Sequence, residues 1–245
     1  MGRFRSEHTL EAIETMRSRL GAEEVDFRGR AVLLFSGGRD SSVVASAYCH
    51  AFPQSELHLL MIDNGLLSRM GCTKRQAELV KGLFPNTDIV FHVKRVSQMM
   101  REIGMQDVEK DFTERGHSTL LICLACKLIM GYSAMKYARE TGINIVMDGY
   151  ANRQRDYPEQ TDEFMSVLRR VYQEGEVVYL SPLYELLSDK DLVNQMLSEL
   201  GITIPRQEPV CMWANSFSTA EPKEITRYLE RKLEQLRAND PILHV

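Results

Sequence analysis

One short stretch constrains this chain more than any other, because residues 33–42 read LLFSGGRDSS. An apolar run leads into two glycines, and a carboxylate and two hydroxyl residues, Ser41 and Ser42, follow. Gly37 and Gly38 allow a sharp turn and let backbone N–H groups approach an anion closely. The start of a helix adds free N–H groups and a favourable dipole. The stretch therefore predicts a phosphate site at a strand–helix junction.

The carboxylate of Asp40 stands out in this loop, because it would repel a phosphate directly. We therefore expect Asp40 to help hold Mg²⁺ or to orient the loop. The alternative is a plain strand–turn–helix junction that uses glycines and a Ser/Asp cap. The stretch is not a Walker loop or a dinucleotide fingerprint, since neither a following Gly-Lys-Ser/Thr nor a G-x-G-x-x-G is present.

Strand and helix patterns alternate along the whole chain. Strands are predicted at 30–36, 56–63, 88–95, 143–150 and 176–183, and helices at 6–20, 41–52, 73–84, 96–103, 123–142, 158–175, 188–201 and 222–236. Alternation of this kind predicts a parallel sheet covered on both faces, and the right-handed crossover rule favours a doubly wound α/β fold. Residues 104–118 look like a loop that is functional or mobile.

Length and charge narrow the classes of protein that fit. A chain of 245 residues suits one large domain. A net charge of -4 does not predict a nucleic-acid binder, although a local basic patch could be hidden in the sum. Neither a signal peptide nor a run of about 18 apolar residues is visible, so we expect a cytoplasmic protein with no membrane span. The five cysteines are an odd number, which favours metal or redox chemistry over disulfides.

SGGRDSS (36–42) resembles the SGGxDS signature of the PP-loop ATP pyrophosphatases, the adenine nucleotide alpha hydrolase-like proteins. LLMIDNGLL (59–67) resembles a stretch after the second strand in GMP synthetases and tRNA thiolation enzymes. The resemblance covers about residues 28–200. It implies a five-stranded sheet and cleavage of Mg²⁺-bound ATP between the α- and β-phosphates. By resemblance, the nucleotide would contact Ser36, Gly37, Gly38, Asp40, Ser41 and Ser42 at the pyrophosphate end, and Ile62, Asp63 and Gly65 at the adenine end.

The segment DGYANRQRD (148–156) departs from the family pattern, because many thiolases carry a histidine and paired aspartates there. Asp148 and Gly149 still fit a nucleotide site at a strand end. Arg153 and Arg155 are candidates to meet a phosphate or an acidic substrate. The alternative is a solvated polar loop.

Two cysteines in ICLAC, Cys123 and Cys126, are spaced as C-x-x-C at the start of a predicted helix, which would lower their thiol pKa values. Alone, the spacing fits a redox pair, half a zinc site, half an iron–sulfur site or two buried side chains. A later Cys211 makes the order resemble tRNA 2-thiocytidine synthetases, whose three cysteines bind a [4Fe–4S] cluster. Zn²⁺ would need a fourth ligand, for which His117 is the candidate. Cyano-deazaguanine synthases use four clustered cysteines, which this chain lacks.

The other two cysteines are weaker candidates. Cys49 lies on a predicted helix of small residues and is expected in the core. Cys72 follows the second predicted strand and is a lesser candidate to line the site.

These features predict an ATP-dependent sulfurtransferase that adenylates its acceptor, releases pyrophosphate and inserts sulfur. Its catalytic residues would be Asp40, Cys123, Cys126 and Cys211. The partners are a sulfur donor and an acceptor, either tRNA or a small molecule, and a homodimer is left open. The alternative is an amide-forming ligase that uses ammonia, with structural or zinc-binding cysteines. A non-catalytic nucleotide-binding module is a third hypothesis. We expect an N-terminal helix in 1–27, the nucleotide-binding domain in 28–205 and a helical tail that closes the site in 206–245.

Overall fold

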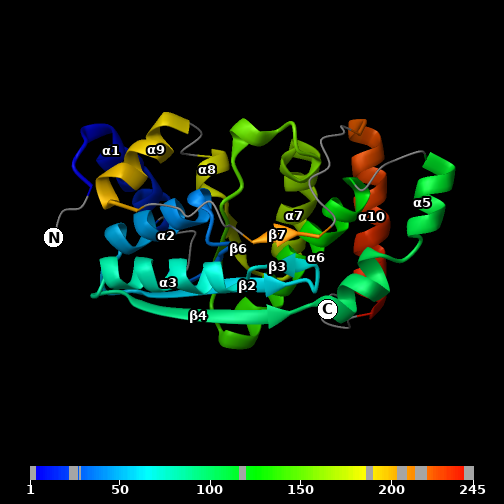
Figure 1. The fold of residues 1–245 in the computed structure, drawn as a ribbon, viewed down its shortest axis with the longest axis horizontal. Helices are drawn as coiled ribbons and strands as arrows, with labels where there is room; N and C mark the ends of the chain where they lie inside the picture. Colours follow the sequence, from blue (N-terminus) through cyan, green and yellow to red (C-terminus); the bar gives the residue numbers. More distant parts are fainter. Residues whose placement is uncertain are drawn as a thin grey trace.

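A parallel five-stranded sheet forms the centre of the molecule (Figure 1). A computed structural model describes residues 4–21, 27, 29–115, 120–185, 190–202, 209–212 and 220–239. The strands are β1 (Arg30–Leu34), β2 (Glu56–Asp63), β4 (Asp88–Arg95), β5 (Ile145–Met147) and β6 (Val178–Leu180), in the order β4-β2-β1-β5-β6. From the central β1 the chain runs outward through β2 to β4, and it then returns to β5 on the other side of β1 and continues to β6. The doubly wound α/β fold predicted from the sequence is confirmed.

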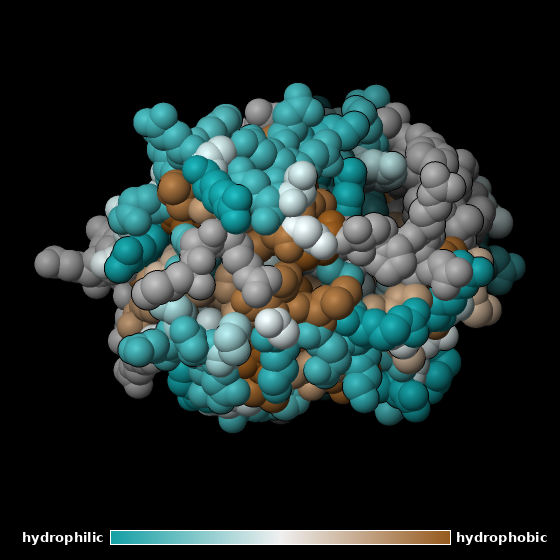
Figure 2. Space-filling view, turned by 60° about the vertical axis from the view of Figure 1, so that its left-hand side comes forward, coloured by the Kyte–Doolittle hydropathy of each residue, from teal (hydrophilic) through white to brown (hydrophobic). Residues whose placement is uncertain are grey.

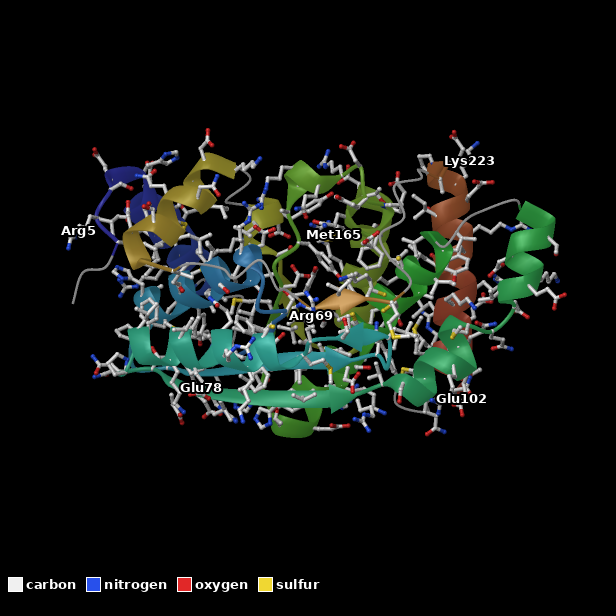
Figure 3. All side chains as sticks on the ribbon, viewed as in Figure 1. Arg5, Arg69, Glu78, Glu102, Met165 and Lys223 are labelled. Atoms are coloured by element: carbon white, nitrogen blue, oxygen red, sulfur yellow. The ribbon has the colours of Figure 1, made fainter. Side chains whose placement is uncertain are left out.

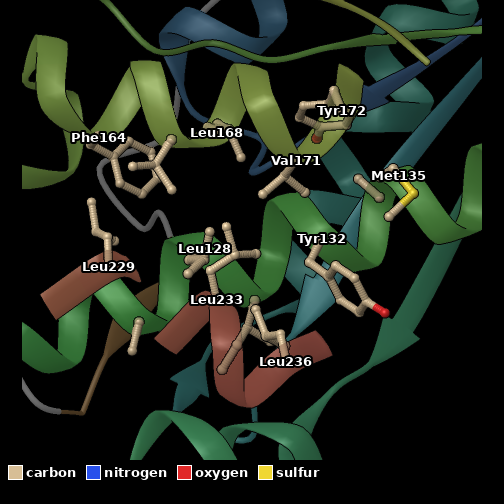
Figure 4. Close-up of a cluster of buried hydrophobic side chains, with 14 of the residues drawn as sticks. Leu128, Tyr132, Met135, Phe164, Leu168, Val171, Tyr172, Leu229, Leu233 and Leu236 are labelled. Atoms are coloured by element: carbon tan, nitrogen blue, oxygen red, sulfur yellow. The ribbon is translucent and has the colours of Figure 1, made fainter. Parts of the chain in front are cut away.

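Helices cover both faces of this sheet. One face carries α1 (Glu7–Leu20), α2 (Arg39–Ala51), α3 (Gly71–Leu83) and α9 (Lys190–Leu200). The other carries α6 (Leu120–Thr141), α7 (Asp162–Glu174) and the C-terminal α10 (Pro222–Asn239). Side chains of β1 alternate between the two cores, since Ala31 and Leu33 join the first and Val32 joins the second. Figure 4 shows the second core where α6, α7 and α10 meet.

Helix α6 is the central helix of the second core. The stretch 121–141 is long and apolar enough to span a membrane, but 67% of its most apolar part is buried inside the fold. Leu128 and Tyr132 of α6 belong to one buried cluster with Leu168 of α7 and Leu233 of α10 (Figure 4). Burial of this kind identifies α6 as a core helix.

Short elements connect these layers. They are β3 (Leu67–Ser68), α4 (Ser97–Met99), a π-helical turn η1 (Met100–Gly104), α5 (Val108–Arg115), the 3-10 turns η2 (Asn152–Gln154) and η3 (Pro158–Gln160), α8 (Pro182–Glu185) and β7 (Val210–Cys211). β3 and β7 pair antiparallel as a separate two-stranded sheet, which the sequence analysis missed.

The prediction of a loop over 104–118 is wrong for most of that segment. Helix α5 occupies Val108–Arg115, and residues 116–119 lie outside the described part. An ion pair between Asp111 of α5 and Arg231 of α10 helps hold the helix against the body. The sequence VEKDFTER of α5 has few apolar residues, so its local pattern indicated a loop.

One face of the molecule has a hydrophobic area across its middle, with hydrophilic residues around it (Figure 2). Among the large apolar side chains that are exposed are Val210 and Met212, on either side of Cys211 in β7. Because strand side chains alternate, these two point away from the side on which Cys211 lies.

Candidate functional site

A cavity of about 550 Å³ opens at the carboxyl ends of the central strands. Its walls come from the loop after β1, the end of β2, helix α6, the segment after β5 and the end of β7. The lining residues include Ser36, Gly38, Arg39, Asp40, Ser41, Met61, Ile62, Asn64, Cys123, Cys126, Lys127, Asp148, Gly149, Tyr150, Gln154, Glu159, Gln160, Pro209 and Cys211. Ligands of doubly wound sheets bind at this edge.

The loop after β1 is built to leave N–H groups free. Helix α2 begins after Gly38, and no side chain caps its first turn. The Ser36 hydroxyl instead accepts from the backbone N–H of Gly38 at 3.2 Å, and lies 3.2 Å from the Ser41 hydroxyl. Uncapped N–H groups at the start of a 13-residue helix suit an anion.

Two glycines allow neighbouring backbone to pack closely against the loop after β1. Gly37 has φ +79°, and a Cβ there would lie 2.8 Å from Cα of Thr73 on α3. Gly149 has a similar role from the other side, because its Cβ would lie 2.8 Å from the backbone nitrogen of Ser41. Gly149 lines the cavity, while Gly37 is absent from its lining and serves the packing of the loop. Ser42 is fully buried, and its hydroxyl has no partner among the described residues.

Asp40 and Arg153 form an ion pair at the loop. Their side chains are 19% and 14% exposed. The sequence suggested a phosphate contact for Arg155 as well, but its guanidinium pairs with Asp162 at 3.1 Å and lies over the ring of Tyr184. Neither arginine is among the residues that line the cavity. The two arginines of this segment therefore have separate environments.

The turn after β2 does not bring all of its expected residues, Ile62, Asp63 and Gly65, to the cavity. The Asp63 carboxylate accepts from the Gly65 backbone N–H at 2.9 Å and pairs with Arg95 at 3.1 Å. Gly65 has φ +79°, and its close neighbour is Ser97, whose Cβ would lie 2.7 Å from an added Cβ. Ile62 lines the cavity, but Asp63 and Gly65 do not. They shape the turn, so the close approach expected of Gly65 is to Ser97.

Asn64 of the same turn was missed, although it is part of the quoted IDNGLL stretch. Its Nδ2 donates to Sγ of Cys126 at 3.0 Å, and its Oδ1 accepts from the Leu66 backbone N–H at 2.8 Å. Asn64 therefore links the nucleotide-side turn to the cysteine pair. An amide inside a recognised motif was the signal that could have found it.

Asp148, at the end of β5, is the most buried carboxyl of the cavity wall. It accepts from Ser181 Oγ at 2.6 Å, from the Tyr150 backbone N–H at 3.1 Å and from the Tyr179 hydroxyl. Burial raises the pKa of Asp148 to about 6, although these donors oppose the shift. The carboxyl is thus held in place by three donors, next to the loop that Gly149 contacts.

All three predicted site cysteines line the cavity. Cys123 and Cys126 lie in α6, and Cys211 lies in β7, where it pairs with Leu67 of β3. The backbone N–H of Met212 also donates to the Leu66 carbonyl at 2.9 Å. The β3–β7 pairing therefore brings a thiol from the far end of the chain onto the same cavity as the C-x-x-C pair.

The expected low thiol pKa values are wrong. Helix α6 begins at Leu120, three residues before Cys123, so the pair lies inside the helix. Burial raises the pKa of Cys123 to about 12 and also raises that of Cys126. Lys127 and the hydrogen bond from Asn64 oppose the shift at Cys126 but do not reverse it. Both thiols are therefore protonated at neutral pH when no metal is bound.

The remaining cysteines lie outside the cavity. Cys49 is buried in the first core, as expected. Cys72 is buried at the start of α3 and accepts from Arg75 at 3.0 Å, and it does not line the cavity. His117, the candidate fourth zinc ligand, lies outside the described residues.

The three cavity cysteines differ in how well they fit the two metal groups that the sequence suggested, a zinc ion and an iron–sulfur cluster. Within the described ranges, no three His, Cys, Asp or Glu side chains are gathered closely enough to hold a single ion. This arrangement does not fit a structural zinc, whose ligands converge on one atom. In an iron–sulfur cluster each cysteine binds a different iron, so three thiols spaced around one cavity fit such a group better.

A protein-made magnesium site is likewise not formed by the described carboxylates at the loop. Asp40 pairs with Arg153, and Asp63 pairs with Arg95. Mg²⁺ commonly reaches such sites on the phosphates of its nucleotide, with few protein ligands. Asp40 therefore does not show the free carboxylate expected of a magnesium ligand.

Several other lining residues were not predicted. Lys127 and Glu159 place opposite charges on the cavity wall near the cysteine pair, and Gln154 and Gln160 line the segment after β5. Glu159 also raises the pKa of Cys123. Their sequence signal is weak, because a lysine beside a cysteine and a polar loop are common in any fold.

The fold and this loop define a PP-loop ATP pyrophosphatase. A family model described as "Queuosine biosynthesis protein QueC" matches residues 30–216. This chain belongs to that family, and the superfamily expected from the sequence is confirmed. A search of curated proteins found no significant relative.

Solved structures support the fold at low identity. The U34-tRNA thiolase NcsA from Methanococcus maripaludis with its [4Fe-4S] cluster is 16% identical with a TM-score of 0.59, over 96% of this chain and 74% of that one. The NH3-dependent NAD synthetase from Campylobacter jejuni is 14% identical with a TM-score of 0.53, over 96% and 87%. The NMN synthetase from Francisella tularensis is 15% identical with a TM-score of 0.53, over 95% and 91%. Neighbours this distant show the fold alone.

Proposed function

We propose that this chain is an ATP-dependent sulfurtransferase whose Cys123, Cys126 and Cys211 hold a [4Fe–4S] cluster. The observation that carries the proposal is that these thiols, from two distant parts of the sequence, line the cavity that the phosphate loop also lines. A nucleotide at the loop and a group on the thiols would share one space. The tRNA thiolase neighbour is described with a [4Fe-4S] cluster, which supports the same reading.

In the proposed enzyme, ATP would bind to the loop after β1 and to the end of β2. Ser36, Gly38, Ser41 and the free N–H groups of α2 would bind the pyrophosphate part of ATP. The backbone at Met61 and Ile62 would face the adenine. Gly37, Ser42, Asp63, Gly65 and Gly149 would keep the surrounding backbone in shape. Mg²⁺ would arrive with the nucleotide.

The reaction would proceed by two displacements. An oxygen of the acceptor attacks the α-phosphorus of ATP, and pyrophosphate leaves. A sulfur nucleophile then attacks the acceptor carbon, and AMP leaves with that oxygen. When bound, the cluster would supply an iron at which sulfur can be held.

The acceptor is either tRNA or a small molecule, and a sulfur donor is required. The net charge of -4 gives no strong electrostatic preference for RNA. We keep the expected division into an N-terminal helix (1–27), a nucleotide-binding domain (28–205) and a C-terminal tail (206–245) as part of the proposal, together with a cytoplasmic location. A homodimer stays open.

Anaerobic purification with iron and sulfide analysis tests the proposal. The expected result is about four irons and four sulfides per chain, lost in Cys123→Ala, Cys126→Ala and Cys211→Ala. Cys72→Ala is the matched control, because Cys72 is buried nearby but does not line the cavity, and it should keep the iron. A colourless, iron-free anaerobic protein that still releases pyrophosphate from ATP would rule out the cluster.

The amide-forming ligase is the second candidate. The thiols of Cys123 and Cys126 have raised pKa values, which is the state of structural cysteines. The similar fold of an NH3-dependent NAD synthetase fits this alternative. An ammonia-using enzyme would keep its activity in Cys211→Ala, where a sulfurtransferase would lose it.

A further inference from the structure

Strand β4 forms one edge of the central sheet (Figure 1). All eight of its residues pair with β2 on one side, and in the described part of the chain no strand pairs with its other side. The opposite edge strand, β6, has only three residues. A long edge strand offers its unpaired N–H and C=O groups to another strand. We propose that two copies of this chain pair through β4 as a symmetric dimer, which is independent of the proposed function.

The backbone of β4 shows which of its groups point outward. The N–H groups of Asp88, at its start, and of Val96, just beyond its end, donate to carbonyls at the two ends of β2 at 2.9 and 2.8 Å. Because the bonding direction alternates along a strand, the even-numbered residues face β2. The N–H and C=O groups of Ile89, Phe91 and Val93 therefore point away from the sheet, where a second strand can bond to them.

Exposed apolar side chains accompany this edge. Val93 is 52% exposed, and Leu79 on the neighbouring α3 is also 52% exposed. Ile89 and Phe91, on the same face of β4 as Val93, pack into the first core, so this face is anchored on its inner side. Apolar side chains left open on two adjoining elements, beside an unpaired strand, are typical of an interaction surface.

The sequence of β4 is complementary to itself when two copies run antiparallel. A two-fold axis through such a pair makes one residue face its own copy, and Phe91 lies near the middle with its backbone groups outward. With Phe91 opposite Phe91, Ile89 faces Val93 of the second copy and Asp88 faces Lys94 of the second copy. Apolar and opposite-charge pairs across strands stabilise an antiparallel pair. The symmetry provides each of these contacts twice.

Charge favours this register over the neighbouring one. Centring the pair on His92 would place two histidines opposite each other and would set Asp88 against Val96. In the register centred on Phe91, the exposed carboxylate of Asp88 meets an ammonium instead. Lys94 already donates to Glu140 of α6 at 3.1 Å. An ammonium has three donors, so Lys94 can bind a second carboxylate as well.

Sedimentation velocity on the full chain tests the dimer. At micromolar concentrations the wild type should have twice the mass of one chain. Val93→Pro should be a monomer, because the N–H of Val93 points away from β2 and proline there breaks pairing between copies only. Val93→Thr keeps this N–H and the branched shape, so it should remain a dimer. Circular dichroism checks that both variants fold.

Two charge variants test the register. Asp88→Lys alone should be monomeric, because two lysines then face each other, and Lys94→Asp alone should be monomeric because two aspartates do. An equal mixture of the two should dimerise, since every facing pair again has opposite charges. Glu11→Lys is the matched control, because it makes the same charge change on α1, away from β4 (Figure 1), and it should stay a dimer.

The cavity gives a second control. None of the substituted residues lines it, so pyrophosphate release from ATP should be unchanged in every variant, and a failure of the proposed function would not affect the dimer. A wild type that stays monomeric throughout the micromolar range would overturn the inference. A dimer that persists in Val93→Pro and in both charge variants would place the contact elsewhere and overturn it too. A mixture of the charge variants that stays monomeric would contradict the pairing of Asp88 with Lys94.

Discussion

The hydroxyl of Ser181 lies 2.6 Å from Oδ1 of Asp148, so the residue that follows β6 fixes the carboxyl at the end of β5. This contact joins two neighbouring strands at the edge of the sheet where the cavity opens. Asp148 is nevertheless so buried that its ionisation is costly, and its pKa is about 6 in the folded chain. The balance between burial and donors at this carboxyl can be measured directly.

The first prediction concerns stability against pH. The pKa of Asp148 is raised from 3.8 to about 6 on folding, so between these values the folded chain holds a proton that the unfolded chain has lost. The free energy of unfolding of the wild type should therefore fall, relative to Asp148→Asn, by roughly 2 kcal/mol as the pH rises from 4 to 6. Urea unfolding across this range measures the difference. A constant difference would contradict the raised pKa.

The second prediction concerns the thiols. In metal-free protein at pH 8, iodoacetamide should label Cys123 and Cys126 far more slowly than it labels the denatured chain, because burial keeps both thiols protonated. Peptide mass spectrometry follows each site. Cys49 is an internal reference, since burial raises its pKa to about 12 as well. Rapid labelling of Cys123 with slow labelling of Cys49 would count against the raised pKa of Cys123.

The third prediction concerns the phosphate loop. Gly37→Ala should destabilise the chain by about 3 kcal/mol, from a left-handed backbone and a contact with Thr73 that must give way. Gly29→Ala is the control, because Gly29 has a similar φ of +72° but no described atom within 4 Å of an added Cβ. Gly29→Ala should lower the free energy of unfolding by only about 1 kcal/mol. Thermal and urea unfolding compare the two, and equal costs would show that the contact with Thr73 is unimportant.

The fourth prediction concerns the C-terminal helix. Lys232 of α10 is fully buried, and its ammonium donates to the carbonyls of Ile103 and Gln106, each at 2.7 Å. Lys232→Met would leave both acceptors unpaired and should lower the free energy of unfolding by about 1–3 kcal/mol. Lys223→Met, at the exposed end of the same helix (Figure 3), should change it little. An unchanged stability in Lys232→Met would show that water replaces the lysine without cost.

Local patterns explain what the sequence could predict. The sheet and most helices follow from apolar runs and periodicity, and the phosphate loop follows from Gly37 and Gly38 between a strand and a helix. The three cysteines were identified by their order along the chain. In each case the signal lies within a few residues or in a recognised arrangement.

Contacts between residues far apart in the chain explain the features that the sequence could not predict. The ion pair of Asp40 with Arg153 gives no local sign of itself, and neither does the hydrogen bond from Asn64 to Cys126. Helix α5 has few apolar residues, and its ion pair with Arg231 of α10 cannot be seen in its own sequence. The thiol pKa values were mispredicted because burial by surrounding elements outweighs a helix start that is itself three residues away.

The two-residue pairing of β3 with β7 has a consequence for how the cavity is assembled. Cys123 and Cys126 belong to a core helix, whereas in the described part of the chain Cys211 is held by the two residue pairs of β3 with β7 and by the hydrogen bonds that flank them. Short ladders open at a small fraction of the free energy needed to unfold a core helix. We therefore expect the part of the cavity wall formed by Cys211 to open at a lower free energy than the part formed by α6.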